Sequence, residues 1–171
     1  ALPAQAEMET RFLSPGQVPE YGMQATDFAP QGWTVEDSWE HELNNDTLMD
    51  MVLMLGEDLP SQVDGIPNER WRALVVLLAE EQGGYRVAGL GLRILHCSTC
   101  YGMLGGPEGG LPLITFHDNV LIVNQLSGSR VMFDLTLRFR FDPGSNRMVL
   151  IGRDARITDR LSASNIEEST N

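Results

Sequence analysis

The chain has 171 residues, of which 24 are acidic and 12 basic, and a formal net charge of -12. This length is sufficient for one domain with a sizeable core and does not require two. The negative charge would repel a phosphate backbone, so we expect no nucleic acid partner, whereas divalent cations and basic proteins would be attracted. The sequence has no stretch that approaches the roughly 18 uninterrupted apolar residues of a membrane-spanning helix.

The first 31 residues contain four prolines and no sustained hydrophobic period. This composition predicts an extended N-terminal arm, 1–31, with little structure. The arm begins with small residues, Ala1 to Ala6, that resemble a processed export boundary, although the charged and apolar regions of a complete signal are missing. Export is compatible with this start, and we expect the folded domain to cover 32–171.

The segment 42–50 carries oxygen-bearing side chains at alternate positions, directly before the apolar run 51–55. Calcium binds about six to eight oxygen ligands, and alternate residues of a tight turn can direct their oxygens at one point. The last acid comes earlier than in an EF-hand, and Thr47 stands where a turn glycine is usual. The alternative is an acidic, solvated turn before a buried strand. The predicted ligands are the side chains of Glu42, Asn44, Asp46 and Asp50 and the backbone carbonyl of Leu48.

Beyond Gly32 the sequence consists of short apolar segments separated by turns, which is typical of an antiparallel, all-β protein. The clearest strand is 131–141, where the odd-numbered residues from 133 are apolar and the even-numbered residues between them are polar. Helical periodicity is weak, and only in 75–81 does a short helix compete. The tail, 162–171, is polar and has no strand pattern. The other predicted strands are 34–35, 51–55, 70–79, 85–90, 92–95, 113–117, 120–125 and 148–154.

Cys97 and Cys100 are the only cysteines, and three kinds of site fit their spacing. A redox pair would sit at a helix start, whereas the strand-like segment 92–95 precedes this pair. A zinc site needs two more ligands, and although His96 or His117 could lie near, no second paired motif completes it. We favour a disulfide that pins the loop to the sheet, which fits an oxidising compartment, although so few cysteines fit the cytosol equally well.

The sequence contains no catalytic constellation that we recognise. The three histidines, His41, His96 and His117, form no triad or metal pattern, and the Gly-x-Ser-x-Gly elbow of serine hydrolases is missing. The glycine-rich segment 105–110 lacks the Gly-Lys-Ser/Thr ending of a phosphate loop. We therefore expect a protein that is not an enzyme.

Three segments, in this order along the chain, resemble exported bacterial proteins. Glu42 to Leu53 is similar to their Gly-Asp-Leu-Asn-x-Asp-Gly-x-x-Asp-Leu-Val-Leu loop, Cys97 to Gly102 to their Cys-x-x-Cys-Gly-Gly segment, and Leu121 to Gly152 to their central sheet. Within that set the chain most resembles the periplasmic lipoprotein immunity proteins of bacteria-killing type IV secretion systems in xanthomonads. These are similar in fold to invertebrate-type lysozyme inhibitors.

The resemblance implies a calcium-binding β inhibitor domain, 32–171, built of twisted antiparallel sheets in a sandwich or an incomplete propeller. It also implies a periplasmic location and a lysozyme-like peptidoglycan hydrolase effector as the partner. Thr47 replaces the loop glycine of the family, and the lipid-attachment cysteine is absent from the sequence. A lipid anchor would therefore lie upstream of residue 1, and we expect no other contact with a membrane.

Related lysozyme inhibitors insert a Ser-Gly-x-Tyr loop into the enzyme's cleft, and the nearest match here is Ser127-Gly128-Ser129-Arg130. A hydroxyl from Ser127 and the guanidinium of Arg130 would bind the catalytic carboxyl group and favour its ionised form, which removes the proton donor. The alternative is an ordinary hairpin turn, in which Ser and Gly are common.

Two other functions stay open at this point. A carbohydrate- or cell-wall-binding module with the same calcium loop would bind glycan without an enzyme and would depend on Trp33, Trp39 and Trp71. A thiol oxidoreductase would depend on Cys97 and Cys100.

Overall fold

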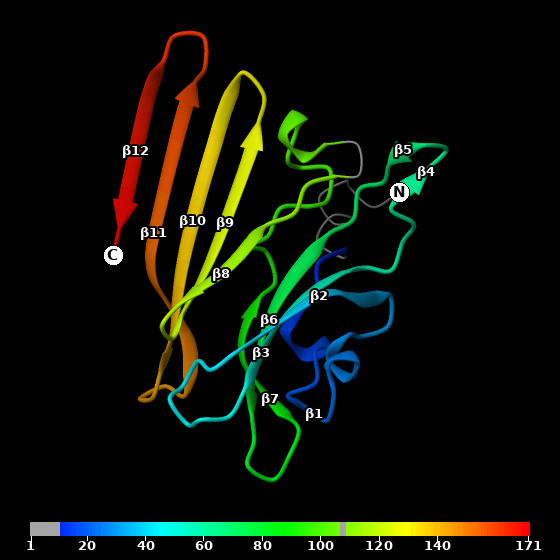
Figure 1. The fold of residues 1–171 in the computed structure, drawn as a ribbon. Coiled ribbons are helices and arrows are strands. Elements are labelled where there is room, and N and C mark those ends of the chain that lie inside the picture. The colour runs from blue at the N-terminus through cyan, green and yellow to red at the C-terminus, as the bar shows by residue number, and fades with distance from the viewer. Residues whose placement is uncertain (1–10, 107–108) are drawn as a thin grey trace.

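The computed structural model describes residues 11–106 and 109–171, and in these ranges the fold is all-β, as predicted (Figure 1). Twelve strands form two five-stranded antiparallel sheets and a two-stranded ribbon. Within the described ranges no helix is long and apolar enough to cross a membrane. The strands are β1 (Tyr21–Gly22), β2 (Trp33–His41), β3 (Asp50–Glu57), β4 (Gln62–Val63), β5 (Ile66–Pro67), β6 (Arg72–Ala79), β7 (Tyr85–Gly91), β8 (Leu113–His117), β9 (Val120–Gly128), β10 (Val131–Asp142), β11 (Arg147–Asp159) and β12 (Ser164–Thr170), and the 3₁₀ helices are η1 (Pro15–Gln17), η2 (Ala25–Phe28) and η3 (Met103–Gly105).

The first sheet, in the order β1-β7-β6-β3-β2, is buried on both faces of its central strands. Alternate side chains of β3 and β6 enter different cores, because successive residues of a strand point to opposite faces. Leu53 and its cross-strand partner Val75 lie in the core on the outer face. Val52 and its partner Val76 lie in the core between the two sheets. This double burial explains the continuous apolar runs in the sequence.

Residues 11–31 cover the outer face of the first sheet. Leu13, Val18 and Phe28 are buried there, and β1 pairs with β7 at the sheet edge. The sequence predicted an extended arm with little structure, and for 11–31 this was wrong. Three apolar side chains without a regular spacing are sufficient to pack the segment against the apolar outer face of the first sheet. The first ten residues of the predicted arm lie outside the described residues.

The second sheet, in the order β12-β11-β10-β9-β8, is covered by the first sheet along only part of its length. Leu121 and Leu137 are buried between the sheets. Further along the same face of β10 lies Phe133, which is 47% exposed, and its cross-strand neighbours Ile157 and Ile166 are also exposed. In Figure 1 the strands β9 to β12 extend well beyond the first sheet. One end of the second sheet is therefore free.

A buried ion cluster fixes the end of the glycine-rich segment to the first sheet. The Arg72 side chain is almost completely buried, with Nε donating to Glu36 Oε2 at 2.7 Å and Nη1 to the Gly110 carbonyl at 2.5 Å. Arg70 forms a second ion pair with Glu36. Loss of any one partner would leave a buried charge without compensation, which is costly. The contact between Arg72 and the Gly110 carbonyl therefore holds the segment before β8 in place.

One predicted strand was wrong, because the segment 92–95 lies in a turn. The predicted strand over 70–79 is confirmed, since β6 continues to Ala79 and the competing helix at 75–81 does not form. The polar tail forms the edge strand β12, in which every residue is exposed. Such a strand carries no apolar alternation, so its sequence gave no signal.

Candidate functional site

The tip of the β9–β10 hairpin contains the predicted inhibitory loop. β9 ends at Gly128 and β10 begins at Val131, so Ser129 and Arg130 form the turn. Gly128 has a φ of 112°, and a Cβ there would lie 2.1 Å from the carbonyl oxygen of Val131, so only glycine fits. The Ser129 amide donates to the same oxygen at 3.1 Å. The turn is tight and closed by its own backbone.

Ser127 and Arg130 are not brought together on one surface. Ser127 is buried, opposite Phe133 in the strand register. The Arg130 side chain is 63% exposed, and Ser129 is exposed beside it. The hydroxyl that accompanies Arg130 at the tip is therefore that of Ser129, which lies in the exposed turn, while Ser127 is buried at the end of β9, where the neighbouring Gly128 amide donates to the Tyr101 carbonyl.

Asp159, at the end of β11, orients the Arg130 guanidinium. Arg130 Nε donates to Asp159 Oδ1 at 3.3 Å and Nη2 donates to Oδ2 at 3.0 Å, a two-point contact that fixes the plane of the guanidinium. This hydrogen bond is the largest cause that lowers the pKa of Asp159. The amide of Arg160 donates to the carbonyl of Arg130 at 3.1 Å, so the turns at the ends of β9 and β11 are cross-linked.

Cys97 and Cys100 form the predicted disulfide, with an Sγ–Sγ distance of 1.96 Å. The bond closes a turn in which the Cys100 amide donates to the Cys97 carbonyl at 3.0 Å. The Tyr101 side chain, which follows directly, is buried with its hydroxyl 3.2 Å from Gln125 Oε1 on β9. Burial raises the pKa of Tyr101 to about 12. The disulfide turn is thus pinned to β9, as the sequence predicted.

The loop 42–50 is wound around its own acceptors. Glu42 Oε1 accepts the backbone amides of Asn44, Asn45 and Asp46, at 3.0 Å from Asn44 and 3.2 Å from Asp46. Asn45 and Thr47 have φ values of 63° and 70°, a left-handed conformation that is uncommon for a β-branched residue such as Thr47. The loop therefore adopts the tight turn that the sequence predicted, at some backbone strain.

Asp50 anchors this loop to the first sheet. Its side chain is fully buried, and its two oxygens accept the amides of Leu43 at 2.7 Å and Ala79 at 2.9 Å. Desolvation raises the pKa of Asp50, and the nearby carboxylates of Asp46 and Glu42 raise it further. A cation bound at the loop would relieve that repulsion.

The donor chemistry of the loop fits a hard cation, since all five predicted ligands present oxygen. In the part of the chain that the structure describes, however, no three carboxylate, imidazole or thiol groups come close enough together to hold a metal ion. The loop is therefore suited to calcium by composition and winding, but its carboxylates do not converge in this structure.

The three histidines lie in three different surroundings. His41 stacks on Phe116 with ring centroids 4.4 Å apart, and its Nε2 lies 2.6 Å from the Asp118 carbonyl. His117 is exposed on β8, while burial lowers the pKa of His96 beside the disulfide. Both cysteines are in the disulfide, so among the described residues no free thiol joins these histidines as a zinc ligand.

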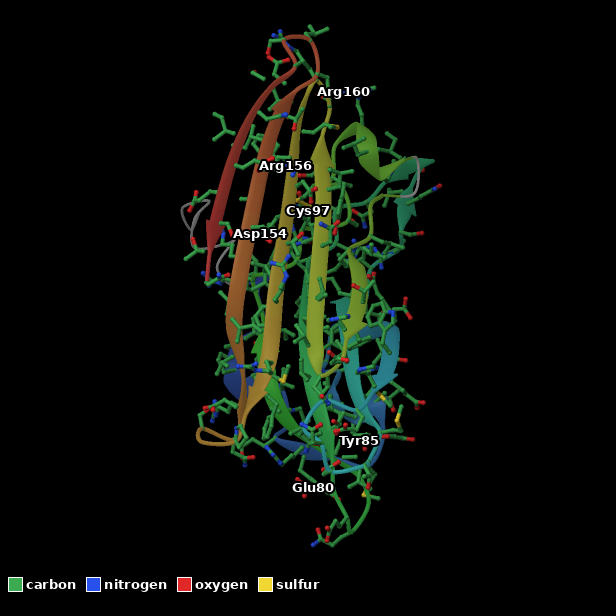
Figure 2. The ribbon with its side chains drawn as sticks, turned by 60° about the vertical axis from the view of Figure 1, so that its left-hand side comes forward. Glu80, Tyr85, Cys97, Asp154, Arg156 and Arg160 are labelled. Carbon is green, nitrogen blue, oxygen red and sulfur yellow. A yellow bond between two sulfur atoms is a disulfide. The ribbon has the colours of Figure 1, made fainter. Side chains whose placement is uncertain are left out.

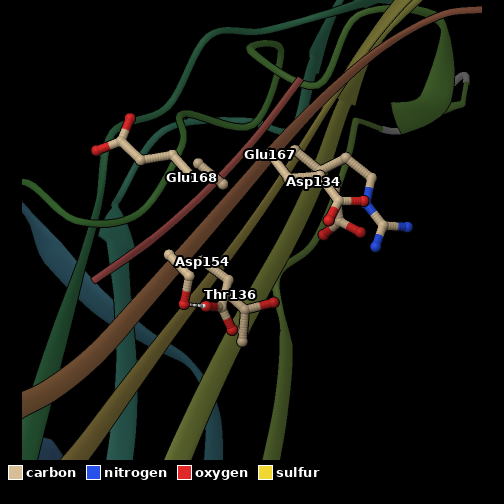
Figure 3. A pocket seen from close by; sticks show the side chains of 8 residues that line it. Asp134, Thr136, Asp154, Glu167 and Glu168 are labelled. Carbon is tan, nitrogen blue, oxygen red and sulfur yellow. Dashed lines mark hydrogen bonds and ion pairs between the residues drawn. The ribbon is translucent and has the colours of Figure 1, made fainter. Parts of the chain in front are cut away.

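An acidic hollow of about 250 Å³ lies on the face of the second sheet that is turned away from the first sheet (Figure 3). Sequence analysis did not identify it, because its residues come from three strands. Each carboxylate has a polar partner: Asp134 accepts from Asn124 at 2.7 Å, and Asp154 accepts from Arg138 and Ser169, each at 2.5 Å. Glu167 pairs with Arg156 on this face, whereas the side chain of Glu168 turns to the opposite face, where it pairs with Arg153. The hollow is a ladder of cross-strand ion pairs, which supports the sheet where no second layer covers it.

No protein-family model, curated protein or solved structure gives a significant match to this chain. The fold and the site geometry therefore define it as an all-β protein with a free sheet end that presents an oriented arginine.

Proposed function

We propose that this protein inhibits a lysozyme-like peptidoglycan hydrolase by inserting the β9–β10 tip into the enzyme's cleft. The observation that carries the proposal is the position of Arg130, whose exposed guanidinium stands at the end of two long paired strands and is oriented by Asp159. A preformed tip of this kind reduces the ordering cost of binding.

The chemistry of the target explains why a guanidinium would inhibit it. Glycosidases of the lysozyme type use two carboxyl groups, one of which must be protonated to act as the acid. A guanidinium beside that group favours its ionised form and lowers its pKa, so the proton is lost. Arg130 supplies the charge, and the exposed hydroxyl of Ser129 supplies a second hydrogen bond in place of the buried Ser127.

The biological setting of the proposal comes from the sequence resemblance. The protein would be a periplasmic immunity protein, with a lipid anchor upstream of residue 1, that protects a cell from an effector of a type IV secretion system. A hydrolase that reaches the periplasm would meet its inhibitor there before it cleaves peptidoglycan.

The test is the cleavage of labelled peptidoglycan by commercial lysozymes and by lysozyme-type effectors, with increasing amounts of this protein. We expect loss of cleavage at a 1:1 ratio. The variant R130Q should need at least about tenfold more protein for the same inhibition, which corresponds to about 1.4 kcal/mol of lost binding free energy. The matched control is R147Q, which changes the charge equally but lies at the other end of β11.

Two outcomes would contradict the proposal. An unchanged cleavage rate with every hydrolase tried would exclude inhibition. Equal inhibition by R130Q and R147Q would exclude the β9–β10 tip as the inserted element.

Calcium forms the second part of the proposal. The side chains of Glu42, Asn44, Asp46 and Asp50 and the Leu48 carbonyl would hold the ion, which would then brace the turn between β2 and β3. The winding of the loop around Glu42, with the carboxylates of Glu42 and Asp46 near Asp50, supports a cation at this position.

Thermal unfolding in calcium, in magnesium and in a chelator tests the calcium site. A free calcium concentration 100 times the dissociation constant stabilises by about 2.7 kcal/mol, which raises Tm by roughly 5 to 10 °C in a chain of this size. D46N should lose most of that increase, while D58N, outside the loop, should keep it. A Tm that does not respond to calcium in the native chain would exclude the site.

The structure favours no aromatic sugar platform among the described residues. Trp39 packs against the core between the sheets, Trp33 packs against the outer core, and Trp71 lies against Phe12 with ring centroids 4.6 Å apart. The tryptophans are thus used for packing. The alternative of a cell-wall-binding module gains no specific observation.

A further inference from the structure

Three segments that are distant in sequence meet at the free end of the second sheet. The Gly128 amide donates to the Tyr101 carbonyl at 3.0 Å, which joins the disulfide turn to the end of β9. The Arg160 amide donates to the Arg130 carbonyl at 3.1 Å, which joins the β11–β12 turn to the β9–β10 tip. Figure 2 shows Arg160 at this extreme end of the sheet, beyond Arg156 and Asp154. The junction is therefore held by backbone hydrogen bonds.

A groove of about 510 Å³ lies between these segments. We propose that it binds an acidic segment of the target enzyme, with carboxylates placed between Arg130 and Arg160 and apolar side chains on either side. This inference rests on the proposed function and extends the contact surface of the inserted tip, with which the groove shares Ser129 and Arg130. The groove is lined by Met103, Leu104, Ser129, Arg130, Arg160 and Leu161.

The charge of the groove is opposite to that of the chain. The chain carries -12 overall, but the groove is lined by two arginines and no acid. Asp159 forms an ion pair with Arg130 and offsets part of its charge. Arg160 forms no ion pair with any residue that the structure describes. An acidic segment would gain two charge-assisted contacts here, while the net negative charge of the chain would disfavour its binding at acidic parts of the surface.

The apolar rim makes this a contact surface for protein. Met103 is 84% exposed and Leu161 is 77% exposed, with the partly exposed Leu104 between them. Apolar side chains grouped on a surface around a polar centre are typical of interaction sites, and Met adapts its shape to a partner. An anionic lipid surface is less suited, because two arginines are too few to overcome the repulsion from a chain of this charge. A second copy of the chain would bring arginine against arginine if the same surfaces met.

The probe is the capped pentapeptide Leu-Glu-Phe-Asp-Leu, added to the ¹⁵N-labelled full chain and followed by NMR. Its matched control is Leu-Gln-Phe-Asn-Leu, which has the same shape without charge. We expect shifts of the amides of Met103, Ser129 and Leu161, and binding of the acidic peptide about tenfold tighter than that of the amide peptide, because a carboxylate accepts a stronger hydrogen bond from a guanidinium than an amide does.

R160Q should weaken binding of the acidic peptide at least about fivefold, corresponding to about 1 kcal/mol, whereas R147Q should leave it unchanged. Equal binding of the two peptides, equal effects of the two variants, or shifts elsewhere only would overturn the inference. So would tight binding to vesicles of anionic phospholipid, or a chain that is dimeric through this groove by light scattering and cross-linking.

The peptide assay contains no hydrolase, so the two proposals can fail separately. Peptide binding without inhibition of any enzyme would refute the proposed function and leave the groove in place. Inhibition that needs Arg130 but not Arg160, with no peptide binding, would refute the groove alone.

Discussion

In both sheets successive side chains point to opposite faces, but the two sheets differ in how much of those faces is buried. In the first sheet both faces are covered, so that Leu53 and Val52, which are neighbours in sequence, are both fully buried in separate cores. In the second sheet one face is covered only where it meets the first sheet, and Phe133 and Ile166 lie exposed on the uncovered part. The first sheet therefore provides the stability, and the free end of the second sheet is available to a partner.

The comparison shows how a fold can present a rigid element without a core beneath it. At the free end no second sheet among the described residues covers β10 to β12, and the strands are held by cross-strand ion pairs on the outer face and by backbone hydrogen bonds between turns. These contacts fix geometry at little gain in stability, because exposed ion pairs contribute about 0–1 kcal/mol each. Such an arrangement suits an element that must keep its shape on contact.

The largest expected effect distinguishes the two sheets directly. L53A, in the first sheet, should lower the free energy of unfolding by about 2–5 kcal/mol, because it leaves a cavity in a fully packed core. I166A, at the free end, should lower it by less than about 1 kcal/mol, because its side chain is 68% exposed. Urea unfolding of the two variants measures the difference, and similar losses would contradict the assignment of stability to the first sheet.

Removal of the disulfide should have an intermediate effect. The chain-entropy estimate for so short a loop is about 2 kcal/mol, and C97A/C100A should lose no more than this in urea unfolding. The amide of Gly128 should also exchange faster with solvent, because its acceptor is the Tyr101 carbonyl next to the disulfide turn. If the amide of Gly128 kept its full protection in this variant, the turn would not depend on the disulfide.

A smaller gain is expected at the loop beside the first sheet. Thr47 is held at a φ of 70°, which glycine adopts without strain, so T47G should raise the free energy of unfolding by about 1 kcal/mol. T34G, in the extended strand β2, is the control and should be destabilising. Destabilisation by T47G would mean that the Thr47 side chain contributes more than its backbone strain costs.

The smallest effect concerns pH and His96. Burial lowers the pKa of His96, so the folded state favours the neutral ring. The stability is therefore complete above the unfolded pKa of about 6.5 and decreases as the pH falls toward the lower folded pKa. Urea unfolding at pH 7.5 and 5.5 should show a smaller decrease in H96Q than in the native chain, while the exposed-site variant H117Q should match the native chain.

The fold was predictable wherever one strand carries its own signal. The alternation in 131–141 and the apolar runs in 51–55 and 70–79 all mark strands of the structure, because burial on one face or on both leaves a local pattern. The edge strand β12 was not predictable, since an exposed strand is polar and pairs through its backbone. The packing of 11–31 depends on a face made by β3 and β6 and therefore has no local signature.

The candidate site was predictable only in part for the same reason. Arg130 was identified from a four-residue resemblance, and the structure places it at an exposed tip. The burial of Ser127 was not predictable, because the disulfide turn that packs against the end of β9 meets it only in the folded chain. Met103 and Arg160 join Arg130 through tertiary contacts, so no sequence motif could have grouped them.

The most direct test of the account is hydrogen exchange of this protein alone and in a 1:1 mixture with the lysozyme-like hydrolase proposed as its target. The account predicts that amides of 127–131 and 160–162 become protected in the mixture, while those of the opposite β10–β11 turn, 143–146, do not change. Protection confined to the opposite turn or to the first sheet, with the β9–β10 tip unchanged, would contradict it.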